Sequence, residues 1–556
     1  MEKKEEPAKG PETKEEHKKK KEKKPKKDKK EGRGQEEVYV KDPNDPCASK
    51  FGDMEPILSA CDPEESAKIV YTSVSDLTEE LDGKVVRIRA RLHNSRIKGK
   101  IGFLVLRENY YTVQALMNVG PEISPGMMKY AKSIPKESLI EVIGVVKDPK
   151  KDIKGCSQKM ELAIQEIHTV SRSVPVLPFQ MEDAMRRTVN QEVEEQEETQ
   201  EKKKEAKKEE KKEENEGEAA EEEKQEIHVL ENTRLNNRVL DMRVPANQAL
   251  MRLQSAVGKY FREFLYSKDF VEIHSPKIIP GVSEGGTQVF RLKYFDKDAC
   301  LAQSPQLYKQ MGICGDLTKV FEIAPAFRAE NSNTNRHLCE FTMLDVEMAF
   351  KNHYFEVIDL LGEMFNYIFE YLEKNCKKEL TVVNEQYPYE PFMWRKPALK
   401  LDFLEGVKLL EEAGIKQSPS EDLTSEAEKT LGEIVKKKYE TDFYILYRYP
   451  KSARPFYTMR DPKDPNYTNS YDFFMRGEEV TSGAQRIHDI KALSKSAAEA
   501  GIPLDTLKDY LDAFKYGPPP HAGCGIGLER VVKLFCGIRN IRKCIMFTRD
   551  PKRLNP

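Results

Sequence analysis

Two arginines that lie far apart in the chain have neighbours suited to phosphate binding. Arg328 belongs to a Phe-Arg-Ala-Glu segment, and Arg530 follows the glycine-rich run 523–529. A guanidinium group is planar and permanently charged, and it can hold phosphate oxygens through paired hydrogen bonds. Glycines let the backbone approach a ligand closely, and the N-terminus of a helix favours an anion. Taken alone, the first segment could equally be a surface ion pair between Arg328 and Glu330, and the second a tight turn into a core helix.

Two carboxylates form a second candidate site. Asp472 and Glu479 are separated by a span that resembles a β-hairpin, which would bring them together. Paired oxygen ligands suit Mg²⁺, which keeps several waters and bridges nucleotide phosphates. Ser482 follows closely and can add a hydroxyl ligand. Ordinary exposed acids are the plain alternative, because most charged side chains are solvated.

Two cations could select an amino acid. If Lys309 and Arg486 converge on one small pocket, they repel each other unless a carboxylate arrives to neutralise them. The preferred ligand side chain is then short and anionic, and an amide would leave the charge uncompensated. A desolvated pocket of this kind can reject an analogue by roughly ten-thousand-fold.

The elements that must position these residues fall into two groups. In the first, β-branched strand segments lie at 85–92, 102–107, 111–116, 139–146 and 161–164, with a helical candidate at 125–133 between the third and the fourth. Five strands in about a hundred residues predict a small barrel of the OB type, which binds single-stranded nucleic acid. Phe103 and Gln114 fall on neighbouring strands, Arg96 in the preceding loop, and Glu161 on the fifth strand. A buried core position is the alternative for Phe103.

The second group predicts an α+β domain. A helix with apolar residues at period 3.6 begins near Leu250, and strands at 320–330 and 340–350 flank a polar loop. In the later strand Asp345 and Glu347 share one face, whereas the apolar residues between them share the other. Helices predicted at 353–377 and 494–514 would cover the back of an antiparallel sheet.

Composition narrows the class of protein. The chain has 556 residues, 33% of them charged, with a net charge of -2. Much of the charge lies in two low-complexity stretches: residues 17–30 hold ten lysines, and residues 191–226 hold seventeen glutamates and eight lysines. The lysine tail is either a solubilising end or a sequence-independent contact to an RNA backbone. Ten cysteines without zinc or disulfide spacing, no apolar run that could span a membrane and no signal peptide predict a cytoplasmic protein.

The motifs, taken in order, resemble those of class II aminoacyl-tRNA synthetases. The helix, strand and proline at 250–276 resemble motif 1, the dimer element, while the segments around Arg328 and Arg530 resemble motifs 2 and 3. Segments 303–310 and 482–486 resemble the substrate-binding segments of the aspartyl enzymes within this class. The resemblance covers nearly everything from about residue 68 to the end, apart from the charged insert.

The resemblance also implies roles for individual residues. Arg328 and Arg530 are the expected catalytic residues. The expected amino-acid site consists of Glu284, Ser304, Gln306, Lys309, Asp345 and Arg486, with Glu284 in a lid at 281–286. The expected ATP site consists of Arg328, Glu330, Arg336, His337, Glu479, Ser482, Gly527 and Arg530. Asp472, Glu479 and Ser482 are the expected Mg²⁺ ligands, and the expected anticodon site consists of Arg96, Phe103, Gln114 and Glu161.

The resemblance implies an aspartyl-tRNA synthetase of the archaeal and eukaryotic kind: a cytoplasmic, homodimeric aspartate–tRNA ligase that uses ATP and Mg²⁺ and acts on tRNA-Asp, without contact to a membrane. The predicted organisation is a lysine-rich, largely disordered extension at 1–50, an OB-fold anticodon-binding domain at 51–182, a hinge with the charged insert at 183–240 and a catalytic domain at 241–556.

Three alternatives stay open at this stage. An asparaginyl enzyme on the same scaffold is disfavoured by Lys309, since that family has no cation at the matching place. A catalytically inactive tRNA-binding scaffold would keep only the barrel and the lysine tail. A relaxed enzyme would charge both tRNA-Asp and tRNA-Asn. The sequence alone does not decide what the insert at 191–226 contacts or whether the protein joins a multi-synthetase assembly.

Overall fold

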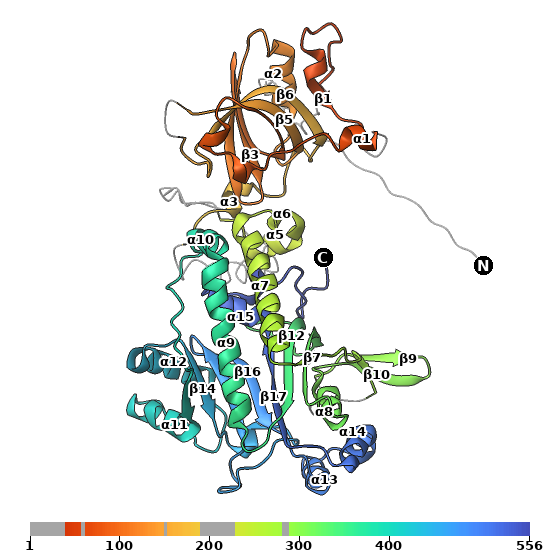
Figure 1. Cartoon of the computed structure of the whole chain (residues 1–556), viewed down its shortest axis with the longest axis vertical. Coiled ribbons are helices and arrows are strands. Elements are labelled where there is room, and N and C mark those ends of the chain that lie inside the picture. The colour runs from red at the N-terminus through yellow and green to blue at the C-terminus, as the bar shows by residue number, and fades with distance from the viewer. Residues whose placement is uncertain (1–38, 57–61, 150–152, 189–227, 281–287) are drawn as a thin grey trace, which may run out of the picture.

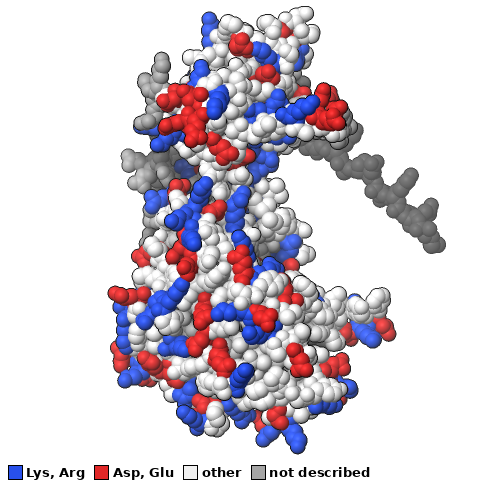
Figure 2. Space-filling model, viewed as in Figure 1, with Lys and Arg blue, Asp and Glu red and all other residues white. Residues whose placement is uncertain are grey.

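A computed structural model describes residues 39–56, 62–149, 153–188, 228–280 and 288–556. A β-barrel lies at one end of the long axis, a short helical hinge follows, and a large α+β body forms the other end (Figure 1). The lysine-rich stretch 17–30, the charged stretch 191–226 and the expected lid at 281–286 lie outside the described residues. Lys/Arg and Asp/Glu side chains are interspersed over the visible face of the molecule (Figure 2).

The barrel is the predicted OB fold. Its strands are β1 (Phe51–Asp53), β2 (Val85–Lys98), β3 (Ile101–Glu108), β4 (Tyr111–Asn118), β5 (Leu139–Lys147) and β6 (Glu161–Ser171). They follow the order β1-β6-β4-β3-β2-β5, and pairing of β5 with β6 closes the barrel. Helix α2 (Pro125–Ser133) begins at Ser124, whose hydroxyl accepts a hydrogen bond from the Met127 amide at 3.0 Å. The five predicted strands and this helix are therefore present, and the short β1 is an addition.

Three short helices lie between the barrel and the body: α3 (Met181–Ala184), α5 (Glu231–Asn236) and α6 (Arg238–Asp241). Another short helix, α1 (Pro63–Ser66), lies beside the barrel. The long helix α7 (Pro245–Ser267) follows α6 directly and runs beside α9 (Phe355–Asn375) along the long axis (Figure 1). Its apolar face, which includes Leu250 and Leu253, is buried in the main core of the body.

The body is built on an eight-stranded sheet in the order β13-β14-β15-β16-β17-β12-β11-β7. The strands are β7 (Val271–Glu272), β11 (Lys319–Phe327), β12 (Glu340–Ala349), β13 (Leu399–Asp402), β14 (Phe443–Tyr447), β15 (Ser470–Met475), β16 (Glu478–Gln485) and β17 (His521–Gly527). The central strands are antiparallel, and only the pairs β13–β14 and β11–β7 are parallel. A separate three-stranded sheet consists of β8 (Ile278–Ile279), β9 (Arg291–Tyr294) and β10 (Lys297–Leu301).

Helices cover both faces of the large sheet. The apolar faces of α7, α9 and α15 (Leu528–Phe535) pack on one side of the sheet and form the main core. The remaining helices are α8 (Gln306–Cys314), α10 (Lys377–Gln386), α11 (Phe403–Glu412), α12 (Ser425–Tyr439), α13 (Ile490–Glu499) and α14 (Lys508–Ala513). Single 3₁₀ turns are η1 (Ala48–Lys50), η3 (Val74–Asp76), η4 (Glu79–Leu81), η5 (Lys451–Ala453), η6 (Leu504–Leu507), η7 (Phe514–Tyr516) and η8 (Ile541–Cys544). The predicted α+β domain with an antiparallel sheet is confirmed.

Some predicted boundaries were wrong. The helix expected at 494–514 is split into α13 and α14, because Gly501 adopts a left-handed φ of +73° and Pro503 follows it. The two helices also do not cover the back of the sheet as expected, because they pack in a separate cluster against α8. The helix expected at 353–377 ends at Asn375, and a second helix begins at Lys377. Arg96 lies within strand β2 and not in a loop before a strand.

Among the helices of the described residues, none combines the length and the apolar character that crossing a membrane requires. The nine cysteines in the described part of the chain are free thiols.

Candidate active site

A cavity of about 360 Å³ opens on the face of the large sheet opposite the main core. Residues from α8, β12, β16, β17, α15 and the loops between the elements line it. It brings together most of the catalytic-domain residues that the sequence singled out: Ser304, Gln306, Arg328, Glu330, Arg336, His337, Asp345, Glu479, Ser482, Arg486, Gly527 and Arg530. Of the other two expected amino-acid contacts, Lys309 lies behind the cavity wall, and Glu284 lies outside the described residues.

Strand β12 supplies two carboxylates to this face. Leu344, Val346 and Met348 belong to the main core, so the alternation of a regular strand turns Asp345 and Glu347 to the opposite side. Both acids are buried, with exposed fractions of 2% and 0%. The predicted division of this strand into an apolar and an acidic face is therefore correct.

Lys309 and Arg486 meet at these carboxylates. The Lys309 ammonium donates to Asp345 Oδ1 at 3.0 Å and lies 3.5 Å from Glu347 Oε2. Arg486 donates from Nε and Nη2 to the two oxygens of Glu347, at 3.0 and 3.1 Å. One carboxylate thus joins the two cations, which lie on α8 and just after β16.

The prediction that an arriving ligand must neutralise two opposed cations was wrong. Although burial opposes its ionisation, the charges of Arg486 and Lys309 hold the pKa of Glu347 below its usual range. The protein therefore supplies a counter-charge itself. Lys309 does not line the cavity, because its ammonium is directed into the sheet and also donates to the Cys524 carbonyl at 2.9 Å.

A glycine in β17 makes room for this buried carboxylate. A Cβ atom on Gly523 would lie 2.3 Å from Glu347 Oε2 and 2.1 Å from the Val346 carbonyl oxygen, far below van der Waals contact. The glycine-rich run at 523–529 therefore serves close packing between β17 and β12 as well as the approach of the backbone to a ligand.

The predicted metal ligands gather at the β15–β16 hairpin. Asp472 and Ser482 lie directly opposite each other in its ladder. Residues three apart in a regular strand point to opposite faces, so Glu479 and Ser482 would normally diverge. An irregularity of one residue in the ladder near Phe473 and Phe474 shifts the register, and both side chains reach the cavity.

The chemistry of this pair fits a divalent cation. Burial and the neighbouring charge of Asp472 raise the pKa of Glu479 to about 7, as expected for two carboxylates that repel each other. Asp472 Oδ1 is buried and has no hydrogen-bond partner among the residues that the structure describes. In the described part of the chain, no group of three or more His, Cys, Asp and Glu side chains is arranged around one point. Asp472, Glu479 and the Ser482 hydroxyl are the residues here that could hold Mg²⁺.

Arg454 is a site residue that the sequence did not reveal. It lies in a loop, and its guanidinium donates to Asp472 Oδ2 at 2.6 Å, to Ser482 Oγ at 2.7 Å and to Ser470 Oγ at 3.1 Å. It also lies over the ring of Tyr449, 4.0 Å from its centre. No periodicity or spacing in the sequence points to it, because its contacts are formed across the fold.

The segment around Arg328 lines another side of the cavity. Arg328 lies one residue beyond the end of β11, not within the strand as expected, and its amide donates to the Cys339 carbonyl at 2.9 Å. Its guanidinium lies over the ring of Phe341, 5.5 Å from the ring centre. Glu330 lies 3.9 Å from His337, so the two sides of the loop at 331–337 face each other.

Arg336, in the same loop, contacts acids from two other elements. Its side chain lies 3.6 Å from Glu428 of α12 and 3.8 Å from Glu478 of β16. Burial and the charge of Glu479 raise the pKa of Glu428 to about 8. Glu428 is a further neighbour of the site that sequence reasoning missed, since α12 reads as an ordinary charged helix.

Arg530 lies at the start of α15. Its Nη1 donates to the Glu479 carbonyl oxygen at 2.8 Å, which ties this helix to the hairpin. The preceding Glu529 is buried, and its carboxylate accepts hydrogen bonds from the Thr342 amide, both at 3.1 Å. Because burial outweighs these bonds, the pKa of Glu529 is raised to about 7.

The expected anticodon residues lie together on the barrel. Phe103 is 42% exposed, which excludes the alternative of a buried core position. Arg96 pairs with Phe103 in the β2–β3 ladder. Gln114 Nε2 donates to Glu161 Oε2 at 2.6 Å across the parallel β4–β6 pair.

Comparison with known proteins agrees with this arrangement. Residues 230–551 match the family model described as tRNA synthetases class II (D, K and N), and residues 81–170 match the OB-fold nucleic acid binding domain. The cytoplasmic aspartate–tRNA ligase of Bos taurus is 49% identical over 90% of this chain and 94% of its own. Aspartate–tRNA ligase 1, cytoplasmic, of Arabidopsis thaliana is 47% identical over 93% of this chain and 92% of its own.

A solved structure agrees as well. The aspartyl tRNA synthetase from Entamoeba histolytica superposes with a TM-score of 0.79 at 42% identity, over 91% of this chain and 96% of that one. Over about nine tenths of the chain, both the sequence and the fold are therefore similar to those of these enzymes. This chain belongs to the class II tRNA synthetases, in the family of the aspartate–tRNA ligases.

Proposed function

We propose that this protein activates L-aspartate with ATP to form aspartyl-adenylate and then transfers the aspartyl group to the 3' end of tRNA-Asp. One observation carries the proposal: the buried ion-pair cluster of Lys309, Asp345, Glu347 and Arg486 reaches, through Asp345 and Arg486, the same cavity as the arginines and carboxylates suited to a nucleotide. A dicarboxylic amino acid and ATP can therefore be held side by side.

Arg486 is the proposed contact to the aspartate side chain. Within the described part of the chain its Nε and Nη2 hydrogen-bond to Glu347, whereas no such bond engages Nη1. Because Arg486 lines the cavity, this remaining donor is available to a ligand carboxylate. Lys309 lies directly behind it and adds positive potential. Asparagine offers Arg486 a neutral amide, so the charged side chain binds better.

Asp345 is the proposed contact to the substrate ammonium, with Ser304 and Gln306 beside it. Its carboxylate already accepts from Lys309 through Oδ1. Oxygens of a carboxylate accept several hydrogen bonds, so the same group can also hold an ammonium. The Gly281–Gly286 segment with Glu284 is the proposed lid.

The first reaction step requires orientation and charge stabilisation. The aspartate α-carboxylate attacks the α-phosphorus of ATP in line, and pyrophosphate leaves. Arg328 is proposed to hold the α-phosphate and the substrate carboxylate, and Arg530 the adenine edge and the terminal phosphate. Glu330, Arg336, His337, Ser482 and Gly527 complete the proposed ATP site. Phe341 offers its ring to the base, beneath the guanidinium of Arg328.

Mg²⁺ bound by Asp472, Glu479 and Ser482 would neutralise phosphate charge during this step. Two arginines of the chain hold these ligands in position: Arg454 donates to the carboxylate of Asp472, and Arg530 donates to the backbone carbonyl of Glu479.

In the second step, the terminal ribose 3' hydroxyl of the tRNA attacks the adenylate carbonyl and AMP leaves. No side-chain nucleophile is required, so the rate comes from positioning. The proposed anticodon contact is the barrel, where Phe103 offers an exposed ring for stacking and Gln114, Glu161 and Arg96 offer polar groups to base edges.

We also propose a homodimer, with α7 and β7 at the interface. Tyr266 and Val271, from these two elements, are 54% and 44% exposed, and such apolar surface is suited to a partner. In this scheme residues 51–182 bind the anticodon, 183–240 form the hinge and 241–556 carry catalysis, while residues 1–50 add a basic extension. The cytoplasm is the proposed location.

Amino-acid-dependent exchange of pyrophosphate into ATP tests the function. We expect exchange with aspartate and almost none with asparagine, and an Arg328→Ala variant should lose at least a hundred-fold. Charging of tRNA-Asp and tRNA-Asn transcripts then separates strict from relaxed tRNA choice. Preferential activation of asparagine, or normal exchange by Arg328→Ala, would overturn the assignment.

A further inference from the structure

The segment after motif 3 holds the loop of motif 2 from outside the cavity. The 3₁₀ turn η8 follows α15, and Arg542 within it is only 6% exposed. Its guanidinium donates to the Thr334 carbonyl at 2.8 Å, to Asn333 Oδ1 at 2.6 Å and to Asp550 Oδ2 at 2.9 Å. Two of these three acceptors belong to the loop at 331–337.

Further hydrogen bonds within the loop connect these contacts of Arg542 to the proposed ATP contacts. The Thr334 hydroxyl accepts from the Arg336 amide at 3.2 Å and shares a hydrogen bond of 2.6 Å with the His337 ring. The neighbouring Ile541 amide donates to the Asn335 carbonyl at 3.0 Å. Arg542 therefore fixes the residue that in turn orients Arg336 and His337.

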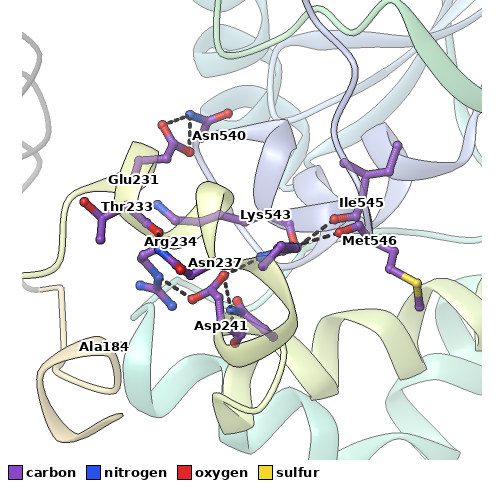
Figure 3. Close-up of polar contacts among 12 residues, drawn as sticks. Ala184, Glu231, Thr233, Arg234, Asn237, Asp241, Asn540, Lys543, Ile545 and Met546 are labelled. Atoms are coloured by element: carbon purple, nitrogen blue, oxygen red, sulfur yellow. Dashed lines mark hydrogen bonds and ion pairs between the residues drawn. The ribbon is translucent and has the colours of Figure 1, made fainter. Parts of the chain in front are cut away.

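The hinge holds η8 from its other side (Figure 3). Arg238 of α6 donates to the carbonyl oxygens of Ile545 at 2.7 Å and Met546 at 2.9 Å. Asn540, which caps η8, donates to both oxygens of Glu231 of α5 at 2.8 Å. Since α5 and α6 are the elements that connect the barrel to the body, the support of the loop is itself anchored on the hinge.

We propose that Arg542 is a positioning residue for the first reaction step: it presets the 331–337 loop, and with it Arg336 and His337, for ATP. This inference rests on the proposed function. The loop is exposed at Asn333, Thr334 and Asn335. A single buried guanidinium with a fixed fork of donors can order such a backbone, whereas a lysine has one donor centre and cannot reach all three acceptors.

The test is an Arg542→Lys variant, which keeps the charge beside Asp550. In aspartate-dependent pyrophosphate exchange we expect the KM for ATP to rise about ten-fold, which corresponds to about 1.4 kcal/mol. The KM for aspartate should change less than two-fold, because its proposed contacts, Arg328 included, lie outside the 331–337 loop. Amide hydrogen exchange of residues 331–337 should become faster in the ligand-free variant.

A second variant tests the inference even if Arg542→Lys fails to fold. Asn333→Ala removes one acceptor from an exposed loop position, so the fold is not at risk, and a smaller rise of about three-fold in the KM for ATP is expected. Because both changes break the same hydrogen bond, the double variant should show less than the product of the two effects. The inference would be refuted if the double variant showed the full product of the two single fold-changes in the KM for ATP. An Arg542→Lys enzyme with an unchanged KM for ATP would also refute it.

The outcomes separate the two proposals. If the wild-type protein shows no aspartate-dependent exchange, the proposed function fails. If the wild type is active and the variants share its KM for ATP and its loop protection, only the role of Arg542 fails.

Discussion

Glu347 provides a quantitative test of the electrostatics at the site, through the substitution Glu347→Gln. The variant keeps the size and one acceptor oxygen but removes the charge between Lys309 and Arg486. Charges separated by 3.0 and 3.5 Å interact by about 5 kcal/mol each at an effective dielectric constant of about 20. Because the amide retains some hydrogen bonding, we expect a net loss of about 3–5 kcal/mol in the free energy of unfolding.

The assay is thermal and urea unfolding with and without ligands. For a catalytic domain of this size, the expected loss lowers the midpoint temperature by about 5 °C. L-aspartate carries one net negative charge into the cavity, so it should raise the midpoint of the variant by more than that of the wild type. Asparagine, which has no net charge, should not.

The matched control is Glu363→Gln. Glu363 also forms an ion pair, with Lys268 at 3.1 Å, but both side chains are largely exposed, and the expected change is less than about 1 kcal/mol. An E347Q protein as stable as this control would refute the reasoning. Equal stabilisation of E347Q by aspartate and by asparagine would show that Glu347 does not set the charge of the amino-acid pocket.

Three further predictions follow from other parts of the molecule. The pKa of Glu529 is raised to about 7, so between its ordinary value and that pH the folded state holds a proton that the unfolded state releases. The free energy of unfolding should therefore fall by up to about 3 kcal/mol as the pH rises through this window. Urea titrations at pH 5 and pH 8 should show this fall for the wild type and a correspondingly smaller fall for Glu529→Gln. An equal fall in both proteins would contradict the prediction. Arg454→Met should lower pyrophosphate exchange about a hundred-fold at saturating Mg²⁺, since Asp472 loses its buried partner; undiminished exchange would exclude that role. Phe103→Ala should raise the KM for tRNA about ten-fold without changing pyrophosphate exchange, whereas Ile101→Ala on the same strand face should do neither, and equal effects of the two would argue against stacking.

The sequence alone determined the class of fold and most of the residues of the cavity. Patterns of period 2 and 3.6 report which face of an element is buried, so the barrel strands, α7 and the acidic face of β12 were predictable from local composition. The glycine, arginine and acidic motifs of the cavity could be identified from the sequence, because each is confined to a few consecutive residues. The resemblance to a known family then ordered these motifs relative to one another.

Tertiary structure decided how the charges are paired. That Glu347 joins Lys309 to Arg486, and that Arg454 holds Asp472, depends on contacts between elements remote in sequence. An irregular ladder brings Glu479 and Ser482 to one side, although their spacing favours opposite faces. Arg542 supports a loop more than two hundred positions earlier in the chain. Local patterns fix which face of an element is buried, but the partner of a buried charge is chosen by packing, because only the assembled fold removes the competing water.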